Sequence, residues 1–316
     1  MTTIEKSARQ HYIDNVRAMM EADDYVTLLR DEGKRPNSLA FKEGAFANYQ
    51  PTAQDVIVST YPKSGTNWTM QMAQEIAWYG EAEFEHVDSA IPWPDTLSQT
   101  PIAPLSDTSM AERSPTGLRV IKSHLEDEYV PYSKEAVYIS VVRDPKDVVV
   151  STFHFENGFF ERMVGGGVPL DAYVEAFLAK GFIYANWADH VASWWRLREY
   201  ENVLLLSFEA IKEEPERAIR AIAELMGVEL SSDQLAKVVH KSSYAYMKAN
   251  NHKFSPPTPP DYPEQGQITM IREGQSGESA RVLSDAQRQA IDQFCADELA
   301  ALGSDFPYWE RYGNDG

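Results

Sequence analysis

Four short segments of the chain are almost continuously apolar and rich in β-branched residues, which is typical of strands buried on both faces of a sheet. They span residues 55–60, 118–123, 136–142 and 202–208. Apolar residues at helical spacing follow the first, third and fourth of these segments. This alternation predicts parallel strands with helices on both faces, and ligands of such sheets bind at the carboxyl ends of the strands.

The expected helices carry start and stop signals. Trp68, Met72 and Ile76 recur at four-residue spacing and predict one apolar stripe after the first strand. Asp144 followed by Pro145 is typical of a helix N-cap with proline at the first helical position. A further helix is expected to begin near residue 215 and to end at the glycine at 227.

Two segments interrupt the alternation. Residues 91–115 are rich in Pro, Ser and Thr, and residues 254–279 begin with a proline cluster and continue through three glycines. Long loops of this kind are either functional lids or surface excursions. Neither an internal repeat nor a domain linker is visible, so residues 1–316 are expected to form a single α/β domain, with residues 1–50 as an N-terminal extension packed on it.

Charge and cysteine content narrow the functional classes. The 316 residues include 29 Lys and Arg and 48 Asp and Glu, a net charge of −19, which would repel nucleic acid and anionic membrane surfaces. Any anionic ligand therefore needs a local basic pocket. A single cysteine excludes an internal disulfide framework, and the absence of a long apolar run argues against a membrane span. We expect a cytoplasmic protein.

The strongest local signal is Tyr61–Trp68 (YPKSGTNW), which lies between the first strand and a helix. In such a turn, backbone N–H groups and the helix N-terminus converge on one point, and Lys63 adds a full positive charge, which suits an anion. The segment is not a Walker A loop, because Lys63 precedes Gly65. A surface turn with a capping Ser or Thr remains the structural alternative.

This loop resembles the 5′-phosphosulfate loop of the sulfotransferases that use 3′-phosphoadenosine 5′-phosphosulfate (PAPS), particularly those of the cytosolic type. Further segments resemble the same family in the same order: Val120–Leu125, Val142–Ser151, Phe208–Pro215, Ser242–Lys248 and Arg272–Gly274. The resemblance extends from about the first strand to about residue 277. It implies the P-loop NTPase-like fold of the sulfotransferases, a central parallel sheet flanked by helices.

The resemblance also implies a reaction. The sulfuryl group of PAPS would pass in line to a hydroxyl group of a small, apolar or phenolic acceptor, without a metal ion. His124 would be the general base, because an imidazole with a pKa near 6.5 accepts a proton at neutral pH. Lys63 would stabilise the leaving phosphate, Lys122 the sulfuryl oxygens, and Ser151 would contact both the 3′-phosphate and Lys63. The oligomeric state stays open.

The nucleotide site implied by the resemblance comprises fourteen residues. They are Lys63, Ser64, Gly65, Thr66, Asn67, Trp68, Arg143, Ser151, Phe208, Ser242, Tyr244, Arg272, Glu273 and Gly274. Arginine is suited to the 3′-phosphate because its forked donors match phosphate oxygens, and aromatic rings can stack on adenine. Aromatic residues within 157–168 are candidates for a mobile wall of the acceptor pocket.

Three positions depart from the family pattern. Glu273 replaces a lysine and would bring a carboxylate near the 3′-phosphate, and Phe208 replaces a tyrosine. Glu278-Ser279-Ala280 replaces a stretch that contains tryptophan. Two alternative functions stay open: a P-loop kinase or NTPase, which would need magnesium, and a nucleotide-binding protein that has lost transfer activity.

Overall fold

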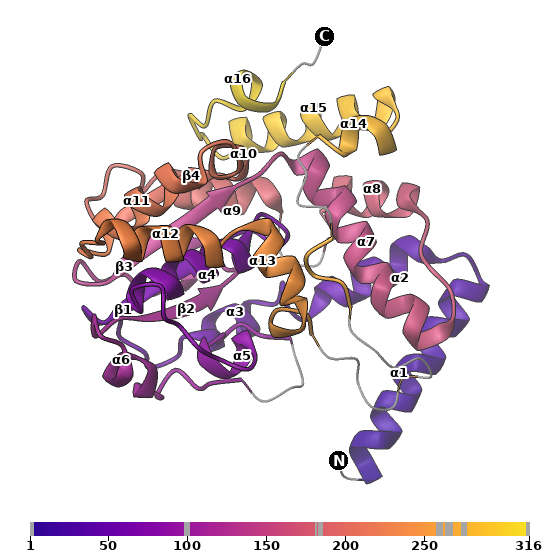
Figure 1. The fold of residues 1–316 in the computed structure, drawn as a ribbon. Helices are drawn as coiled ribbons and strands as arrows, with labels where there is room; N and C mark the ends of the chain where they lie inside the picture. The colour runs from indigo at the N-terminus through magenta and orange to yellow at the C-terminus, as the bar shows by residue number, and fades with distance from the viewer. Residues whose placement is uncertain are drawn as a thin grey trace.

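Four parallel strands form the centre of the fold (Figure 1). They are β1 (Asp55–Ser59), β2 (Arg119–Ser123), β3 (Val137–Val142) and β4 (Val203–Ser207), in the spatial order β2-β1-β3-β4. This computed structural model describes residues 3–97, 102–180, 182, 186–256, 262, 268–272 and 277–313. The four predicted strands and their parallel arrangement in one α/β domain are confirmed.

Helices connect the strands and cover both faces of the sheet. They are α1 (Thr3–Glu21), α2 (Tyr25–Lys34), α3 (Leu39–Ala45), α4 (Thr66–Ala77), α5 (Val87–Ala90), α6 (Ser109–Arg113), α7 (Pro145–Val164), α8 (Leu170–Leu178), α9 (Trp187–Trp195), α10 (Phe208–Glu213), α11 (Pro215–Leu225), α12 (Ser232–Lys241), α13 (Tyr244–Ala249), α14 (Ser279–Val282), α15 (Asp285–Ala301) and α16 (Tyr308–Tyr312). Two 3-10 turns, η1 (Asp127–Tyr129) and η2 (Asn251–Lys253), complete the elements of the described residues.

Side chains from successive strand positions enter different core clusters, because they point to opposite faces of the sheet. Val56 and Val58 of β1 pack with α4 and α11, whereas Ile57 between them packs on the other face with Tyr138 and with Trp194 of α9. Each of these side chains is almost completely buried. Burial on both faces explains why the strands read as continuous apolar runs in the sequence.

The predicted helix signals act as expected at α7. The Asp144 carboxylate accepts a hydrogen bond from the Lys146 backbone N at 2.9 Å, and Pro145 occupies the first turn. The helix continues to Val164, so most of the proposed mobile acceptor wall at 157–168 is regular helix. Phe160 lies in the core together with Met163, which corrects that expectation for the Phe160 side chain.

Helices α1 and α2 pack on the same side of the molecule as α7, whereas α3 lies near η1 (Figure 1). Helix α2 contacts α8, and α1 contacts both α2 and α7. The segment 91–115, expected to be a loop throughout, contains the short helix α6. No helix in the described part of the chain is long and apolar enough to cross a bilayer.

Candidate active site

The loop between β1 and α4 turns sharply at the carboxyl edge of the sheet. Lys63 has φ 65° and Gly65 has φ 99°, both in the left-handed region that L-residues with a side chain rarely adopt. A Cβ atom at Gly65 would lie 2.9 Å from the Phe208 ring. Gly65 is therefore required both by backbone conformation and by the close approach of the aromatic ring. The Thr60 and Thr66 hydroxyl groups meet at 2.5 Å and join the two ends of the loop.

The Lys63 ammonium group lies in an apolar and cationic setting. Its Nζ is 3.8 Å from the centroid of the Phe155 ring on α7 and 3.5 Å from the Met270 sulfur. Burial, followed by the charges of Arg143 and Lys122, lowers the pKa of Lys63 to about 7. An anion bound here would relieve both the desolvation and the repulsion between cations.

Lys122, at the end of β2, lies against an aromatic ring that the sequence analysis did not identify. Its Nζ is 3.2 Å from the centroid of Trp93, and the same ring stands edge-on to His124 with centroids 5.4 Å apart. Burial lowers the pKa of Lys122 to about 8. The Trp93 ring thus contacts both Lys122 and His124.

Hydrogen bonds on two sides fix the orientation of His124. Its Nδ1 lies 2.8 Å from the backbone oxygen of Thr60, and its backbone N donates to the buried Asp95 carboxylate at 2.8 Å. Burial, followed by the charge of Lys122, lowers the pKa of His124 well below its ordinary value. A neutral imidazole that donates Nδ1–H to a carbonyl carries its lone pair on Nε2. This tautomer can accept a proton from a bound hydroxyl group.

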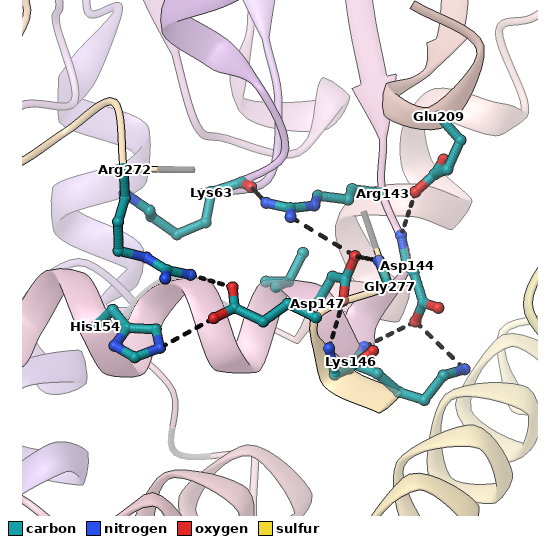
Figure 2. Close-up of polar contacts among 12 residues, drawn as sticks. Lys63, Arg143, Asp144, Lys146, Asp147, His154, Glu209, Arg272 and Gly277 are labelled. Carbon is teal, nitrogen blue, oxygen red and sulfur yellow. Dashed lines mark hydrogen bonds and ion pairs between the residues drawn. The ribbon is translucent and has the colours of Figure 1, made fainter. Parts of the chain in front are cut away.

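Arg143, at the start of α7, is the centre of a polar network (Figure 2). Its Nη1 donates to the backbone oxygen of Lys63 at 2.9 Å, and its Nη2 lies 3.7 Å from the Asp147 carboxylate. The guanidinium carbon is 4.3 Å from the centroid of Phe208. Ser151 follows Asp147 by four residues on α7 and therefore lies on the same helix face.

Aromatic residues form the opposite side of the site. The Trp68 indole donates to the backbone oxygen of Ser242 at 2.7 Å, and its ring meets Phe208 edge-on at 5.7 Å. The Tyr244 hydroxyl donates to the backbone oxygen of Arg272 at 2.9 Å and is more exposed. Through these contacts, α4, α10, α13 and the segment 268–272 lie side by side at the edge of the site.

The structure thus brings together most of the residues that the sequence singled out. Lys63, Arg143, Phe208, Trp68 and their neighbours converge at the carboxyl ends of the strands, while Asn67 lies in the first turn of α4. Glu273 and Gly274 lie outside the described residues. The sequence reasoning missed Trp93, Asp95, Asp147, His154, Phe155 and Met270 as parts of the site.

Two buried hydroxyl groups of the site are available to bind an anionic nucleotide. The Ser64 and Ser242 hydroxyl oxygens are buried and have no hydrogen-bond partner within the described part of the chain. Buried polar atoms of this kind require a partner, and phosphate or base atoms can supply one. In the same described part, no group of three or more His, Cys, Asp or Glu residues is arranged to hold a metal ion.

The fold defines the general class: an α/β protein with a parallel sheet whose first strand leads into a basic loop and a helix. A family model described as the sulfotransferase domain matches residues 53–303. Sulfotransferase 2B1 of Rattus norvegicus is 31% identical over 288 residues, which cover 89% of this chain and 80% of that protein. Sulfotransferase 2A1 of Macaca fascicularis is 30% identical and covers 81% of this chain and 88% of its own.

Solved structures agree on the fold. Mouse sulfotransferase SULT7A1 complexed with PAP aligns with a TM-score of 0.60 and 23% identity, over 83% of this chain and 89% of that one. Retinol dehydratase in a complex with retinol and PAP aligns with a TM-score of 0.64 and 20% identity, over 85% and 88%. The chain belongs to the sulfotransferase family of the cytosolic type, and it is a sulfotransferase enzyme.

Proposed function

We propose that this enzyme transfers the sulfuryl group of PAPS to a hydroxyl group of a small, apolar or phenolic acceptor, with His124 as the base. The observation that carries this proposal is the 2.8 Å contact between Nδ1 of His124 and the Thr60 carbonyl oxygen, which leaves Nε2 as the acceptor nitrogen, beside Lys122 and Lys63. Nε2 takes the hydroxyl proton while the acceptor oxygen bonds to sulfur. The bond from sulfur to the bridging phosphate oxygen breaks, and 3′-phosphoadenosine 5′-phosphate (PAP) leaves.

Lys63 and Lys122 have separate roles in this proposal. Lys63 follows β1 directly and stabilises the charge that appears on the bridging oxygen, whereas Lys122 faces the sulfuryl oxygens in transfer. Both ammonium groups lie over aromatic rings, so they are pre-positioned without an internal carboxylate within ion-pair distance among the described residues. Arg143, Arg272 and Ser151 hold the 3′-phosphate, and the rings of Trp68 and Phe208 contact the adenine.

Aromatic side chains near His124 and Lys63 indicate the acceptor class. Trp93 and Phe155 supply aromatic surface on either side of the transfer position. Retinol dehydratase, of the same fold, has been solved in complexes with retinol and with androsterone, both of which are described as ligands of that protein. Aromatic walls and a neutral base suit an apolar or phenolic alcohol.

A cytoplasmic location agrees with the single buried cysteine.

The proposal is tested by incubating the purified enzyme with PAPS carrying labelled sulfur and a panel of phenols, aliphatic alcohols and carbohydrates. We expect label in phenols or apolar alcohols, and an unchanged rate when magnesium is removed with a chelator. Retention of PAP with no transfer to any acceptor would contradict the catalytic proposal. Hydrolysis or transfer of a nucleotide γ-phosphate that requires magnesium would favour a kinase or NTPase instead.

Binding of PAP is expected to take up protons as the pH rises above about 7. The pKa of Lys63 is about 7 in the free protein, and a bound phosphate favours its charged form and raises that pKa. Between these two values Lys63 is neutral when free and charged in the complex. Affinity therefore falls as the pH rises above about 7. Calorimetry in buffers of different ionisation enthalpy measures the uptake, which Lys63→Met should reduce, with any remainder coming from Lys122. An affinity independent of pH in wild type would contradict the assignment.

A further inference from the structure

A carboxylate lies inside the part of the site assigned to the 3′-phosphate. Glu278 is only 8% exposed, and its Oε2 accepts a hydrogen bond from Nη2 of Arg272. Its other oxygen, Oε1, is 3.4 Å from Nε2 of His154 on α7 (Figure 2). An acidic side chain therefore occupies a position between two groups that could contact a bound anion.

The backbone on both sides of Glu278 is anchored independently of that side chain. The Asp147 carboxylate on α7 accepts hydrogen bonds from the backbone N of Gly277 at 2.7 Å and of Ser279 at 3.0 Å. The same carboxylate is the ion-pair partner of Arg143. Asp147 thus fixes the segment 277–279 against α7, and it sets where the Glu278 carboxylate points. Replacing the Glu278 side chain leaves these backbone hydrogen bonds in place.

Both arginines of the proposed 3′-phosphate site consequently have carboxylate partners within the protein. Arg143 is held by Asp147 and by the Lys63 carbonyl, and Arg272 is held by Glu278. Arg143 is nearly buried, whereas the Arg272 side chain is 32% exposed and lies outside the helices and strands. Arg272 is therefore the arginine that can exchange its partner when a ligand arrives.

We propose that Glu278 is an internal anion that competes with the 3′-phosphate of the nucleotide for Arg272, and so determines how strongly the enzyme selects nucleotides that carry this phosphate. This inference rests on the proposed function and on its assignment of Arg272. A phosphate dianion forms stronger charge-assisted hydrogen bonds with a guanidinium group than one carboxylate does. It must nevertheless displace Glu278 and remain near its negative charge. A nucleotide without the 3′-phosphate leaves the pair intact.

The inference is tested by measuring the binding of PAP and of adenosine 5′-monophosphate, which differ only in the 3′-phosphate, by calorimetry at one pH and salt concentration. Glu278→Gln removes the charge and retains the size of the side chain. We expect PAP to bind about tenfold more tightly, because a charge opposed to the dianion is lost. Binding of adenosine 5′-monophosphate should change by less than about twofold. Glu278→Ala is the second variant and should act in the same direction.

Two control variants distinguish an effect of the Glu278 charge from a general disturbance of the protein structure. Glu278→Asp keeps the charge and should stay closer to wild type than Glu278→Gln does. Asp285→Asn removes an exposed carboxylate that pairs with Arg288 within α15, and it should alter neither affinity. Melting temperatures show that each variant is folded at the temperature of the binding experiment.

Weaker PAP binding in both Glu278→Gln and Glu278→Ala would mean that Glu278 orients Arg272 for the phosphate, and it would overturn the inference. An unchanged affinity for PAP, or equal changes for both nucleotides, would overturn it as well. Failure of the proposed function has a different signature: the wild-type enzyme itself would then bind PAP no better than adenosine 5′-monophosphate and transfer no sulfuryl group.

Discussion

Replacing His124 with alanine is expected to lower kcat by about 10²–10⁴-fold, the usual contribution of a general base, while PAP binds almost as in wild type. The base acts on the acceptor hydroxyl and does not hold the nucleotide. The structure explains why His124 is neutral. Burial, and after it the charge of Lys122, lowers the pKa of His124 well below its ordinary value. The imidazole is therefore neutral at pH 7, with one ring nitrogen unprotonated. Initial rates with a saturating acceptor and calorimetry with PAP measure the two effects.

Two further variants decide whether His124 acts as a base or only positions its neighbours. His124→Asn can keep a hydrogen bond to the Thr60 carbonyl but places no acceptor where Nε2 lies, so it should be as inactive as the alanine variant. His11→Ala, at an exposed position on α1, should retain full activity. More than half of the wild-type kcat in His124→Asn would show that another group removes the proton.

The strands and the loop between β1 and α4 could be predicted because their signals are local. Burial on both faces requires continuous apolar runs, and the basic turn of Lys63–Gly65 directly follows the first of them. Parallel strands place their carboxyl ends at one edge of the sheet. The convergence of Lys63, Lys122 and Arg143 follows from those two facts, because each residue lies at or just beyond the end of a strand.

The residues that orient the proposed catalytic groups could not be found in the same way, because their contacts join distant parts of the chain. Trp93 and Asp95 lie in a segment with no periodic pattern, and only the fold brings them to Lys122 and His124. The segment was expected to be a lid or a surface loop, and neither reading identifies a particular side chain. An isolated tryptophan and an isolated aspartate in a loop carry no signal of their own.

The orientation of Glu278 could not be predicted from the sequence either. The sequence marked it as a departure from the family pattern, without indicating that its carboxylate turns inward. Its orientation depends on Asp147, which lies 131 positions earlier by residue number and accepts the backbone hydrogen bonds of Gly277 and Ser279. In the sequence Asp147 is only an acidic residue in the first turn of a helix, where such residues are common.

Replacing Lys63 with methionine is expected to lower kcat by about 10²–10³-fold, the cost of removing one preorganised donor from a developing anion, with a smaller loss of PAP affinity. Its ammonium group matters most when the bridging oxygen becomes negative, so the interaction is stronger in the transition state than in the ground state. Methionine has similar length and apolar contacts, and it can therefore keep its place against Phe155 and Met270. Steady-state rates at saturating PAPS and calorimetry with PAP separate the two effects.

Whether Lys63 acts in catalysis or only in binding is decided by how far its replacement lowers kcat and how far it raises KM. Lys63→Arg keeps a positive charge and should retain more activity than methionine, although the larger guanidinium group must fit the same aromatic setting. Lys212→Met, at an exposed position on α10, should leave both parameters unchanged. A rise in KM for PAPS with an unchanged kcat would mean that Lys63 binds the ground state and the transition state equally. Stabilisation of the leaving phosphate would then have to come from another donor, such as the backbone N–H groups at the start of α4.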